Sequence, residues 1–401
     1  MIFFYFLIGV MPLTSHPFWS RTVSDLTVFK YLGAVSLLYA VSYLVVCRKF
    51  PPFFGTWQAR LFLILYLIAA VSYFTKALPS PWEFSPFLSF TSFLLLFFIT
   101  LSVVDTERRL HRVLLVAIGS VAFASIYVIR EWQVYHTVYR GLRPGSVVGD
   151  SNYFTISALV CLPLAFYFML ERPPRWERCF CLGCLVLTSV GVTLGASRGG
   201  ALGLVAGFLF AVWRSRRRVR NLALGSVLLV PLSLMAPSSP VRRFLQPSFG
   251  DKESVVARTT AWKVGLRMIQ AHPLMGVGLG NFKPLMPRYA DPGTKVSTIA
   301  HNTYVELAAE TGLPSLLVFL AILFFSLRTL ERVRRAALRS GQALLWQAVL
   351  GIQAGLVGYA VASFFVSAEY QKLFWLMVFL SMCLQSLTTR PARALTNERK
   401  A

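Results

Sequence analysis

The chain has 401 residues, of which 56% are hydrophobic and 14% charged, with a mean hydropathy of +0.61. Soluble domains carry about 25% charged residues, so this composition excludes an ordinary soluble enzyme and indicates a polytopic membrane protein. The 40 Lys and Arg against 16 Asp and Glu give a net charge of +24, which basic cytoplasmic loops explain, and no nucleic-acid motif or partner is expected.

Twelve apolar runs are long enough to cross a membrane, some only with their flanking residues. They lie at 2–18, 26–47, 60–77, 84–104, 110–130, 151–170, 179–196, 199–213, 221–237, 303–327, 343–366 and 371–388. We therefore predict an all-α polytopic membrane protein with about 12 transmembrane helices, or 10 to 12 because 199–213 is short and the first run is optional. The first run lacks a basic start and a clear cleavage site, which favours a short span over a signal peptide.

The basic residues concentrate in alternate connections. The segments 48–60, 108–112, 172–178, 214–220, 328–339 and 390–400 hold 23 of the 40, whereas the other short connections hold six. By the positive-inside rule the first set and both termini are cytoplasmic. The one long loop, 238–300, then lies on the external face.

Arg198 lies on that external face, in the short turn GASRGGALG between two spans. An arginine at membrane depth usually faces the interior of a helix bundle and serves a function. The alternative is an interfacial arginine whose charged head reaches water.

An amphipathic helix is predicted before Pro273, because Trp262, Leu266 and Ile269 recur at helical spacing. Basic side chains flank this apolar stripe at Arg258, Lys263 and Arg267. Such a helix can lie in the interface against anionic head groups, and arginine can also hold a phosphate by two hydrogen bonds.

The stretch AHNTYVELAAETGLPS at 300–315 places His301 and Asn302 where the external loop returns to the membrane. Glu306 and Glu310 follow, one helical turn apart. Intramembrane carboxylates are costly and usually functional or paired, so the external arginines are their expected partners. The alternative for His301 is a structural or interfacial histidine.

The preceding external loop YRGLRPGSVVGDSNYF adds Arg143, Asp150 and Asn152, which an ordinary turn with a helix N-cap would also explain. Two further patterns are rejected as sites. The cysteines of CFCLGC at 179–184 have no His or carboxylate beside them, and GVGLGNF at 276–282 has no βαβ unit around it. We expect no metal site.

Three blocks taken together resemble the O-antigen ligase and O-antigen polymerase superfamily. They are S-R-G-G, then R-x3-W-x8-A-H-P-L-x-G-V-G-L-G-N-F, then H-N-x-Y-x-E-L-x-A-E-x-G-L-P, and the resemblance covers roughly residues 140–330. It implies a class C glycosyltransferase-like helical bundle with one long external loop. It also implies a metal-independent enzyme without cofactors, in the bacterial inner membrane.

The resemblance assigns His301 as the catalytic residue and Arg198 and Arg258 as binders of the donor diphosphate. The donor would be an undecaprenyl-diphosphate-linked glycan, and the acceptor lipid A–core or another glycan, among membrane lipids. Supporting positions would be Asn302, Glu306, Glu310, Arg143, Asp150, Asn152, Lys263 and Arg267. The segment DSN at 150–152 lacks the proline that the family often has there, which leaves the role of that loop open.

The predicted organisation is N-terminal transmembrane helices at 1–130, a ligase-like catalytic domain at 131–388 including the loop 238–300, and a cytoplasmic basic tail at 389–401. The predicted activity is glycan transfer to an acceptor hydroxyl on the periplasmic or external face, with inversion, His301 acting as the base or only orienting the acceptor. An O-antigen ligase is favoured. The alternatives are a repeat-unit polymerase and, from another class, a flippase or transporter of lipid-linked glycans.

Overall fold

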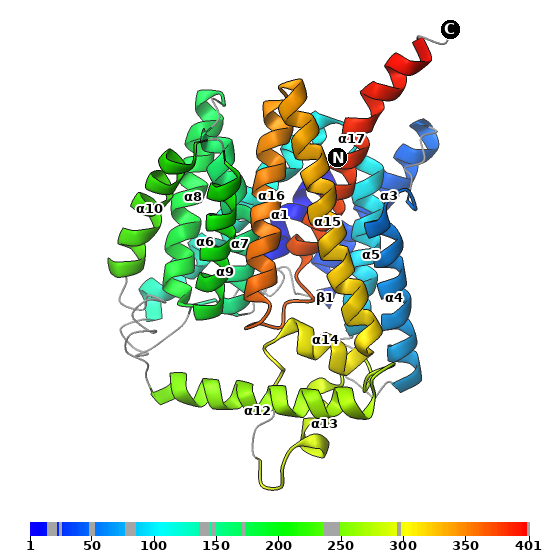
Figure 1. Cartoon of the computed structure of the whole chain (residues 1–401), viewed down its shortest axis with the longest axis vertical. Coiled ribbons are helices and arrows are strands. Elements are labelled where there is room, and N and C mark those ends of the chain that lie inside the picture. Colours follow the sequence, from blue (N-terminus) through cyan, green and yellow to red (C-terminus); the bar gives the residue numbers. More distant parts are fainter. Residues whose placement is uncertain are drawn as a thin grey trace.

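A computed structural model describes residues 1–13, 22–23, 26–47, 53–76, 86–135, 144–145, 150–170, 173–215, 217–235, 249–294 and 298–398. These residues are almost entirely helical (Figure 1). The exceptions with regular structure are a 3-10 turn at Met11–Leu13 and one antiparallel pair of two-residue strands, β1 (Thr22–Val23) and β2 (Leu26–Thr27).

The helices follow one another along the chain as the hydropathy pattern predicts. They are α1 (Ile2–Val10), α3 (Val28–Cys47), α4 (Trp57–Lys76), α5 (Pro86–Val103), α6 (Glu107–Tyr135), α7 (Ser151–Leu170), α8 (Arg175–Gly195), α9 (Arg198–Arg214), α10 (Arg218–Met235), α12 (Phe249–Ala271), α13 (Phe282–Tyr289), α14 (Thr303–Thr311), α15 (Leu313–Ser340), α16 (Ala343–Ala362) and α17 (Lys372–Glu398).

Eight of the described helices are long and apolar enough to cross a membrane, namely α3, α4, α5, α6, α7, α8, α15 and α16. Two shorter apolar helices cover Ile2–Leu13 and Lys372–Thr388. The all-helical, polytopic prediction is confirmed, whereas the count of about 12 spans is not. Many side chains on the outer helix faces are apolar and exposed, among them Leu38, Phe74 and Leu317, as expected of surfaces in contact with lipid.

The predicted span 303–327 is wrong as a single helix. Gly312 has φ 87°, which ends α14 after nine residues and turns the chain into α15. Pro314 lies in the first turn of α15, where proline is well tolerated because that N–H needs no partner within the helix. The residues after His301 therefore form a short separate helix.

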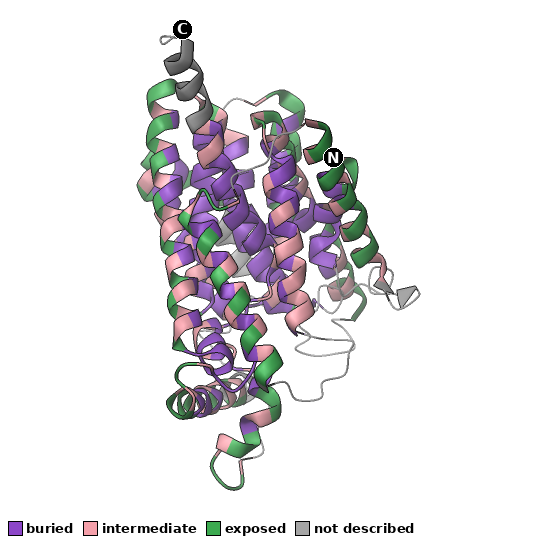
Figure 2. Cartoon of the chain, turned by 90° about the vertical axis from the view of Figure 1, so that its right-hand side faces the viewer, coloured by how far each residue is buried: buried purple, intermediate pink, exposed green. Residues whose placement is uncertain are grey.

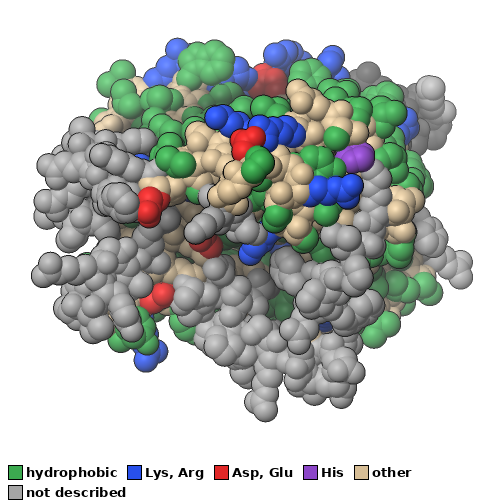
Figure 3. Space-filling view, turned by 90° about the horizontal axis from the view of Figure 1, so that it is seen from below, with side chains coloured by type: hydrophobic (Ala, Val, Ile, Leu, Met, Phe, Trp, Pro, Cys, Tyr) green, Lys and Arg blue, Asp and Glu red, His purple; other side chains and the backbone are tan. Residues whose placement is uncertain are grey.

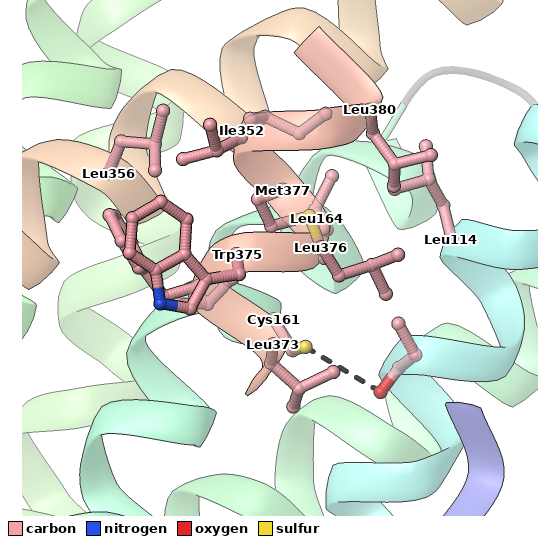
Figure 4. Close-up of a cluster of buried hydrophobic side chains, with 14 of the residues drawn as sticks. Leu114, Cys161, Leu164, Ile352, Leu356, Leu373, Trp375, Leu376, Met377 and Leu380 are labelled. Atoms are coloured by element: carbon pink, nitrogen blue, oxygen red, sulfur yellow. Dashed lines mark hydrogen bonds between the residues drawn. The ribbon is translucent and has the colours of Figure 1, made fainter. Parts of the chain in front are cut away.

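Buried residues fill the interior of the bundle (Figure 2). The core lies around α7 and α16, in which 83% and 78% of the residues in the apolar stretch are buried. α7 packs against α6, α8, α9 and α16, and α16 also contacts α15 and α17. Figure 4 shows leucines of α6, α7, α16 and α17 in one buried cluster that also contains Trp375, and the Cys161 thiol donates to the carbonyl O of Ala117 at 3.5 Å.

Small residues allow α9 and α16 to approach closely. A Cβ on Gly203 would lie 2.5 Å from the carbonyl O of Gly358, and one on Gly207 would lie 2.6 Å from that of Ala354. Backbones that meet in this way gain dispersion contacts that larger side chains would prevent. This packing fixes α9, and with it the start of α9 at Arg198.

α12 lies across one end of the bundle, with α13 beyond it and α14 between α12 and the long helices (Figure 1). Both chain termini lie towards the opposite end. At that end Arg214 of α9 and Arg334 and Arg335 of α15 form ion pairs with Glu331. A cluster of arginines paired with Glu331 therefore lies at the end of the bundle opposite α12.

The amphipathic helix predicted before Pro273 is confirmed as α12, in which Trp262 and Ile269 are half-buried. Leu266 is 54% exposed, whereas Ala261, Val264 and Met268 are buried. These three residues recur at i, i+3 and i+7 and face α13 and α14, which the sequence of α12 alone does not specify.

We predict that Gly203→Ala destabilises the protein, because the new methyl group would overlap the carbonyl of Gly358. Overpacking of this kind costs about 1–3 kcal/mol of unfolding free energy. The matched control is Gly33→Ala in α3, where nothing lies within 4 Å of a Cβ and alanine improves helix propensity. Thermal unfolding in detergent measures both, and equal melting temperatures for the two variants would contradict the packing argument.

Candidate functional site

His301 immediately precedes α14 and has a backbone φ of 49°, in the left-handed region that few non-glycine residues adopt. The next residue, Asn302, is the N-cap of α14, and its side-chain oxygen accepts hydrogen bonds from the N–H groups of Tyr304 (3.0 Å) and Val305 (3.1 Å). The cap fixes where the helix begins. The half-buried His301 is thus held at a defined position at the helix start.

α12 brings the segment of Arg258 to the same place. The indole Nε1–H of Trp262 donates to the carbonyl O of Ala300 at 2.9 Å, directly before His301. Gly265 faces Val305 of α14 so closely that a Cβ would lie 2.4 Å from it. Arg258, which is half-buried, lies one helical turn before Trp262 on the same helix.

The S-R-G-G turn, residues 197–200, lies at this end of the bundle as well. Ser197 caps α9 by accepting from the N–H of Gly200 at 3.2 Å, and its hydroxyl donates to Asn152 Oδ1 of α7 at 2.8 Å. Arg198 is the first residue of α9 and is half-buried. Its neighbour Gly199 packs on Phe365, where a Cβ would lie 2.5 Å from the Phe365 Cβ.

The connection between α16 and α17, residues 363–371, joins these segments. The N–H of Thr303 donates to the carbonyl O of Ser363 at 2.9 Å, and the Thr303 hydroxyl donates to that of Val366 at 2.8 Å. Phe365 of the same connection contacts the Arg198 turn. The starts of α9 and α14 and the middle of α12 therefore meet at one end of the bundle.

Glu306 and Glu310 are both buried, and their carboxylates accept hydrogen bonds from neighbouring backbone. Glu306 Oε2 accepts from the N–H of Ala300 at 3.1 Å and from the Ser367 hydroxyl, and Glu310 Oε1 accepts from the N–H of Phe282 at 3.1 Å. The expectation that the arginines would be their partners is wrong for the described residues. The donors to these two buried carboxylates come instead from the start of α13 and from the connections before α14 and before α17.

Burial shifts the titration of both groups. It raises the pKa of Glu306 to about 7 against the opposing hydrogen bonds from Ser367 and Ala300. Burial and then the proximity of Glu306 raise the pKa of Glu310 to about 8. α14 has nine residues, too few to cross a membrane, and lies at the α12 end of the bundle (Figure 1).

The glycine-rich stretch at 276–282 wraps around the end of α14. The N–H groups of Val277 and Gly278 donate to the carbonyls of Ala309 and Glu310 at 2.8 and 2.9 Å. Gly276 has φ 64° and lies so close that a Cβ would be 2.3 Å from the Glu310 carbonyl. These amides are used within the fold.

The residues predicted to support the site have different surroundings in the structure. Asp150 caps α7 by accepting from the N–H of Asn152 at 2.6 Å, and the buried Asn152 binds Ser197, so both shape the Arg198 turn. Lys263 is exposed on α12. Arg267 pairs with Asp291 at 2.8 Å and donates to the Tyr289 carbonyl, which ties α12 to the end of α13. Arg143 lies outside the described residues.

The connection 363–371 was not predicted as part of the site. Ser367 binds Glu306, and Glu369 is buried, with its Oε2 atom unpartnered among the described residues. The signal in the sequence is a glutamate and a glutamine, at positions 369 and 371, in a short link between two apolar runs. A buried polar group in such a link needs partners from distant elements, which the sequence does not name.

Seen from the α12 end, the described surface carries exposed Lys and Arg side chains (Figure 3).

Residues 183–320 match the family model described as O-antigen ligase. This matched segment, about a third of the chain, is similar to that family and is called the O-antigen ligase domain. The resemblance drawn from the three motifs is thus confirmed, and the matched range contains Arg198, Arg258 and His301. No curated protein matches the chain.

The O-antigen ligase domain begins inside α8 and ends inside α15, so it includes α9, α12, α13 and α14. Proteins of this family are glycosyltransferase-like enzymes that use lipid-linked glycans and acceptors in the membrane. The apolar helices agree with that location. Helices α7 and α16 and the connection 363–371 lie outside the matched range but contact the O-antigen ligase domain directly.

The raised pKa of Glu310 predicts a pH dependence of stability. Its folded pKa of about 8 exceeds the ordinary 4.5, so the folded state retains a proton that the unfolded state releases. The stabilisation is complete below about pH 4.5 and is lost as the pH rises through 8. Glu310→Gln keeps an oxygen for the N–H of Phe282 and should lose less melting temperature between about pH 5 and pH 9 than the unaltered protein. Parallel curves would contradict the assignment.

Proposed function

We propose that this protein is a glycosyltransferase that moves a glycan from an undecaprenyl-diphosphate carrier onto an acceptor hydroxyl, as an O-antigen ligase with lipid A–core or a similar acceptor. One observation carries the proposal. The segments of Arg198, Arg258 and His301 converge at a single end of the bundle, inside an O-antigen ligase domain.

The negative charge that develops on the leaving group explains the role of the two arginines. When the glycosidic C–O bond breaks, its electron pair stays on the lipid diphosphate, whose negative charge grows in the transition state. Half-buried guanidinium groups already held in place stabilise that charge without reorganisation. Arg198 is positioned by the Ser197 cap, and Arg258 by the helix that Trp262 fixes to Ala300.

His301 takes the proton of the acceptor hydroxyl while that oxygen attacks the anomeric carbon on the side opposite the departing diphosphate. The new C–O bond then has inverted configuration. A general base must be neutral before the reaction. In the second mechanism considered, His301 only orients the acceptor through a hydrogen bond.

The membrane arrangement follows from the charge distribution. The arginine-rich end that includes Arg214, Arg334 and Arg335 is cytoplasmic, together with both termini. The α12 end then faces the periplasm, where the donor is already activated and needs no nucleotide. We propose the bacterial inner membrane as the location.

The deciding experiment compares a strain lacking the gene with strains carrying the unaltered gene or His301→Ala. We expect the deletion and His301→Ala to accumulate long undecaprenyl-linked chains and to lose surface glycolipid. Single repeat units capped on core would instead identify a polymerase. A wild-type pattern with His301→Ala would remove the catalytic assignment and favour a flippase.

His301→Gln separates the two mechanisms, because glutamine can hold an acceptor hydroxyl by a hydrogen bond but cannot serve as a general base. We expect turnover to fall by about 100- to 10,000-fold, the usual contribution of general base catalysis. Substantial turnover by this variant would favour the orienting role.

Arg198→Lys and Arg258→Lys should each lower turnover by about 100- to 1000-fold, because lysine cannot hold a phosphate through two hydrogen bonds. Arg288→Lys on the exposed side of α13 is the matched control and should retain activity. Release of undecaprenyl diphosphate from a purified lipid-linked glycan measures the rate. Equal activity in all three variants would exclude diphosphate binding by Arg198 and Arg258.

A further inference from the structure

The backbone on both sides of His301 is held by hydrogen bonds to one distant segment. On the far side, Thr303 makes four bonds to the connection 363–371. Its N–H donates to the carbonyls of Ser363 at 2.9 Å and Val366 at 3.2 Å. Its hydroxyl donates to the Val366 carbonyl and accepts from the N–H of Ala368, each at 2.8 Å.

On the near side, the carboxylate of Glu306 links Ala300 to the same connection. One oxygen, Oε2, accepts both from the N–H of Ala300 at 3.1 Å and from the hydroxyl of Ser367. Glu306 is 5% exposed and Ser367 is 1% exposed, so water cannot replace this hydroxyl easily. The other Ala300 backbone group, its carbonyl, is taken by Trp262.

His301 therefore lies between two anchored neighbours while its own φ of 49° costs conformational energy. A left-handed non-glycine residue persists only where its surroundings determine it from several sides. Asn302 provides one constraint by capping α14, and Ala300 and Thr303 provide the others. Together these contacts fix the Cα–Cβ direction of the histidine.

We propose that Ser367 and Thr303 are positioning residues for His301, so that the α16–α17 connection is part of the active site although it lies outside the O-antigen ligase domain. Ser367 acts through the Glu306 carboxylate on Ala300, and Thr303 acts through the connection itself. The proposal rests on the catalytic role of His301.

Replacing a positioning residue and replacing a residue that only supports the fold affect different kinetic parameters. Among the described residues, neither Ser367 nor Thr303 hydrogen-bonds to α9 or α12, the helices that carry the arginines. Although Trp262 of α12 also bonds to Ala300, α12 is held independently by its buried residues Ala261, Val264 and Met268 and by the Arg267–Asp291 ion pair. Loss of the Ser367 hydroxyl should therefore displace the base and leave the diphosphate site in place. The predicted signature is a lower kcat with an unchanged KM for the donor, since small displacements of a reacting group reduce turnover strongly.

The experiment uses the full-length protein in lipid vesicles, with lipid-linked glycan and acceptor glycolipid extracted from the deletion strain. We expect Ser367→Ala to lower kcat by about 10- to 100-fold with little change in donor KM or in inhibition by undecaprenyl diphosphate. Ser367→Thr restores the hydroxyl and should recover most of the rate. Ser381→Ala is the matched control, a buried serine whose hydroxyl only donates to the Val378 carbonyl of its own helix.

Thr303→Val provides a second variant, because it keeps the shape of the side chain while removing both hydroxyl bonds to the connection. It should reproduce the loss of kcat at unchanged donor KM. Rates are expressed per folded protein, measured by gel filtration and thermal unfolding.

The outcomes separate the positioning role from the proposed function. If His301→Ala is inactive while Ser367→Ala and Thr303→Val keep full kcat, the positioning role is overturned and the proposed function stands. If kcat and donor affinity fall together without rescue by threonine, the connection supports the fold only, and the positioning role fails. If His301→Ala itself remains active, the proposed function fails first.

Discussion

α14 is a nine-residue helix that lies between a bundle and a transverse helix, and its buried ends need hydrogen-bond partners from other elements. Thr303 and Asn302 provide them at the start, through the connection 363–371 and the N-cap. At the other end, the carbonyls of Ala309 and Glu310 accept from Val277 and Gly278. The rest of the site depends on this docking, because α12 and His301 are placed relative to α14.

The hydrogen-bond partners of the buried carboxylates Glu306 and Glu310 indicate a role that differs from the one the sequence suggests. Glu306 and Glu310 look like members of a charged site in the sequence, yet in the fold they accept from backbone N–H groups before His301 and at the start of α13. A carboxylate is a strong acceptor, and one side chain can satisfy donors that loops leave without a partner. The substrate chemistry that we propose is assigned to the arginines and the histidine and not to these carboxylates.

Close packing of α9 against α16 holds the candidate site at the α12 end of the bundle in place. Gly203 and Gly207 let α9 contact the backbone of α16, and α16 leads directly into the connection that holds Thr303. Arg198 at the start of α9 and Thr303 at the start of α14 are therefore fixed against one helix and its continuation. This arrangement explains how two segments a hundred residues apart reach one place, and why the matched O-antigen ligase domain is in contact with helices outside it.

The sequence by itself determined the class of the protein, the approximate ranges of most helices, the helix that ends before Pro273 and the family. Each of these depends on local information, namely hydropathy over some twenty residues, helical spacing, and motifs of contiguous residues. The sequence did not specify which face of α12 packs against α13 and α14, because an amphipathic helix with several small and apolar residues offers more than one face and only its neighbours select between them. The partners of Glu306 and Glu310, the break at Gly312 and the part played by Ser367 were decided only by the tertiary structure. The physical reason is that a buried polar group is satisfied by whichever donor the packing brings near, and for Glu306 that donor lies 61 residues further along the chain.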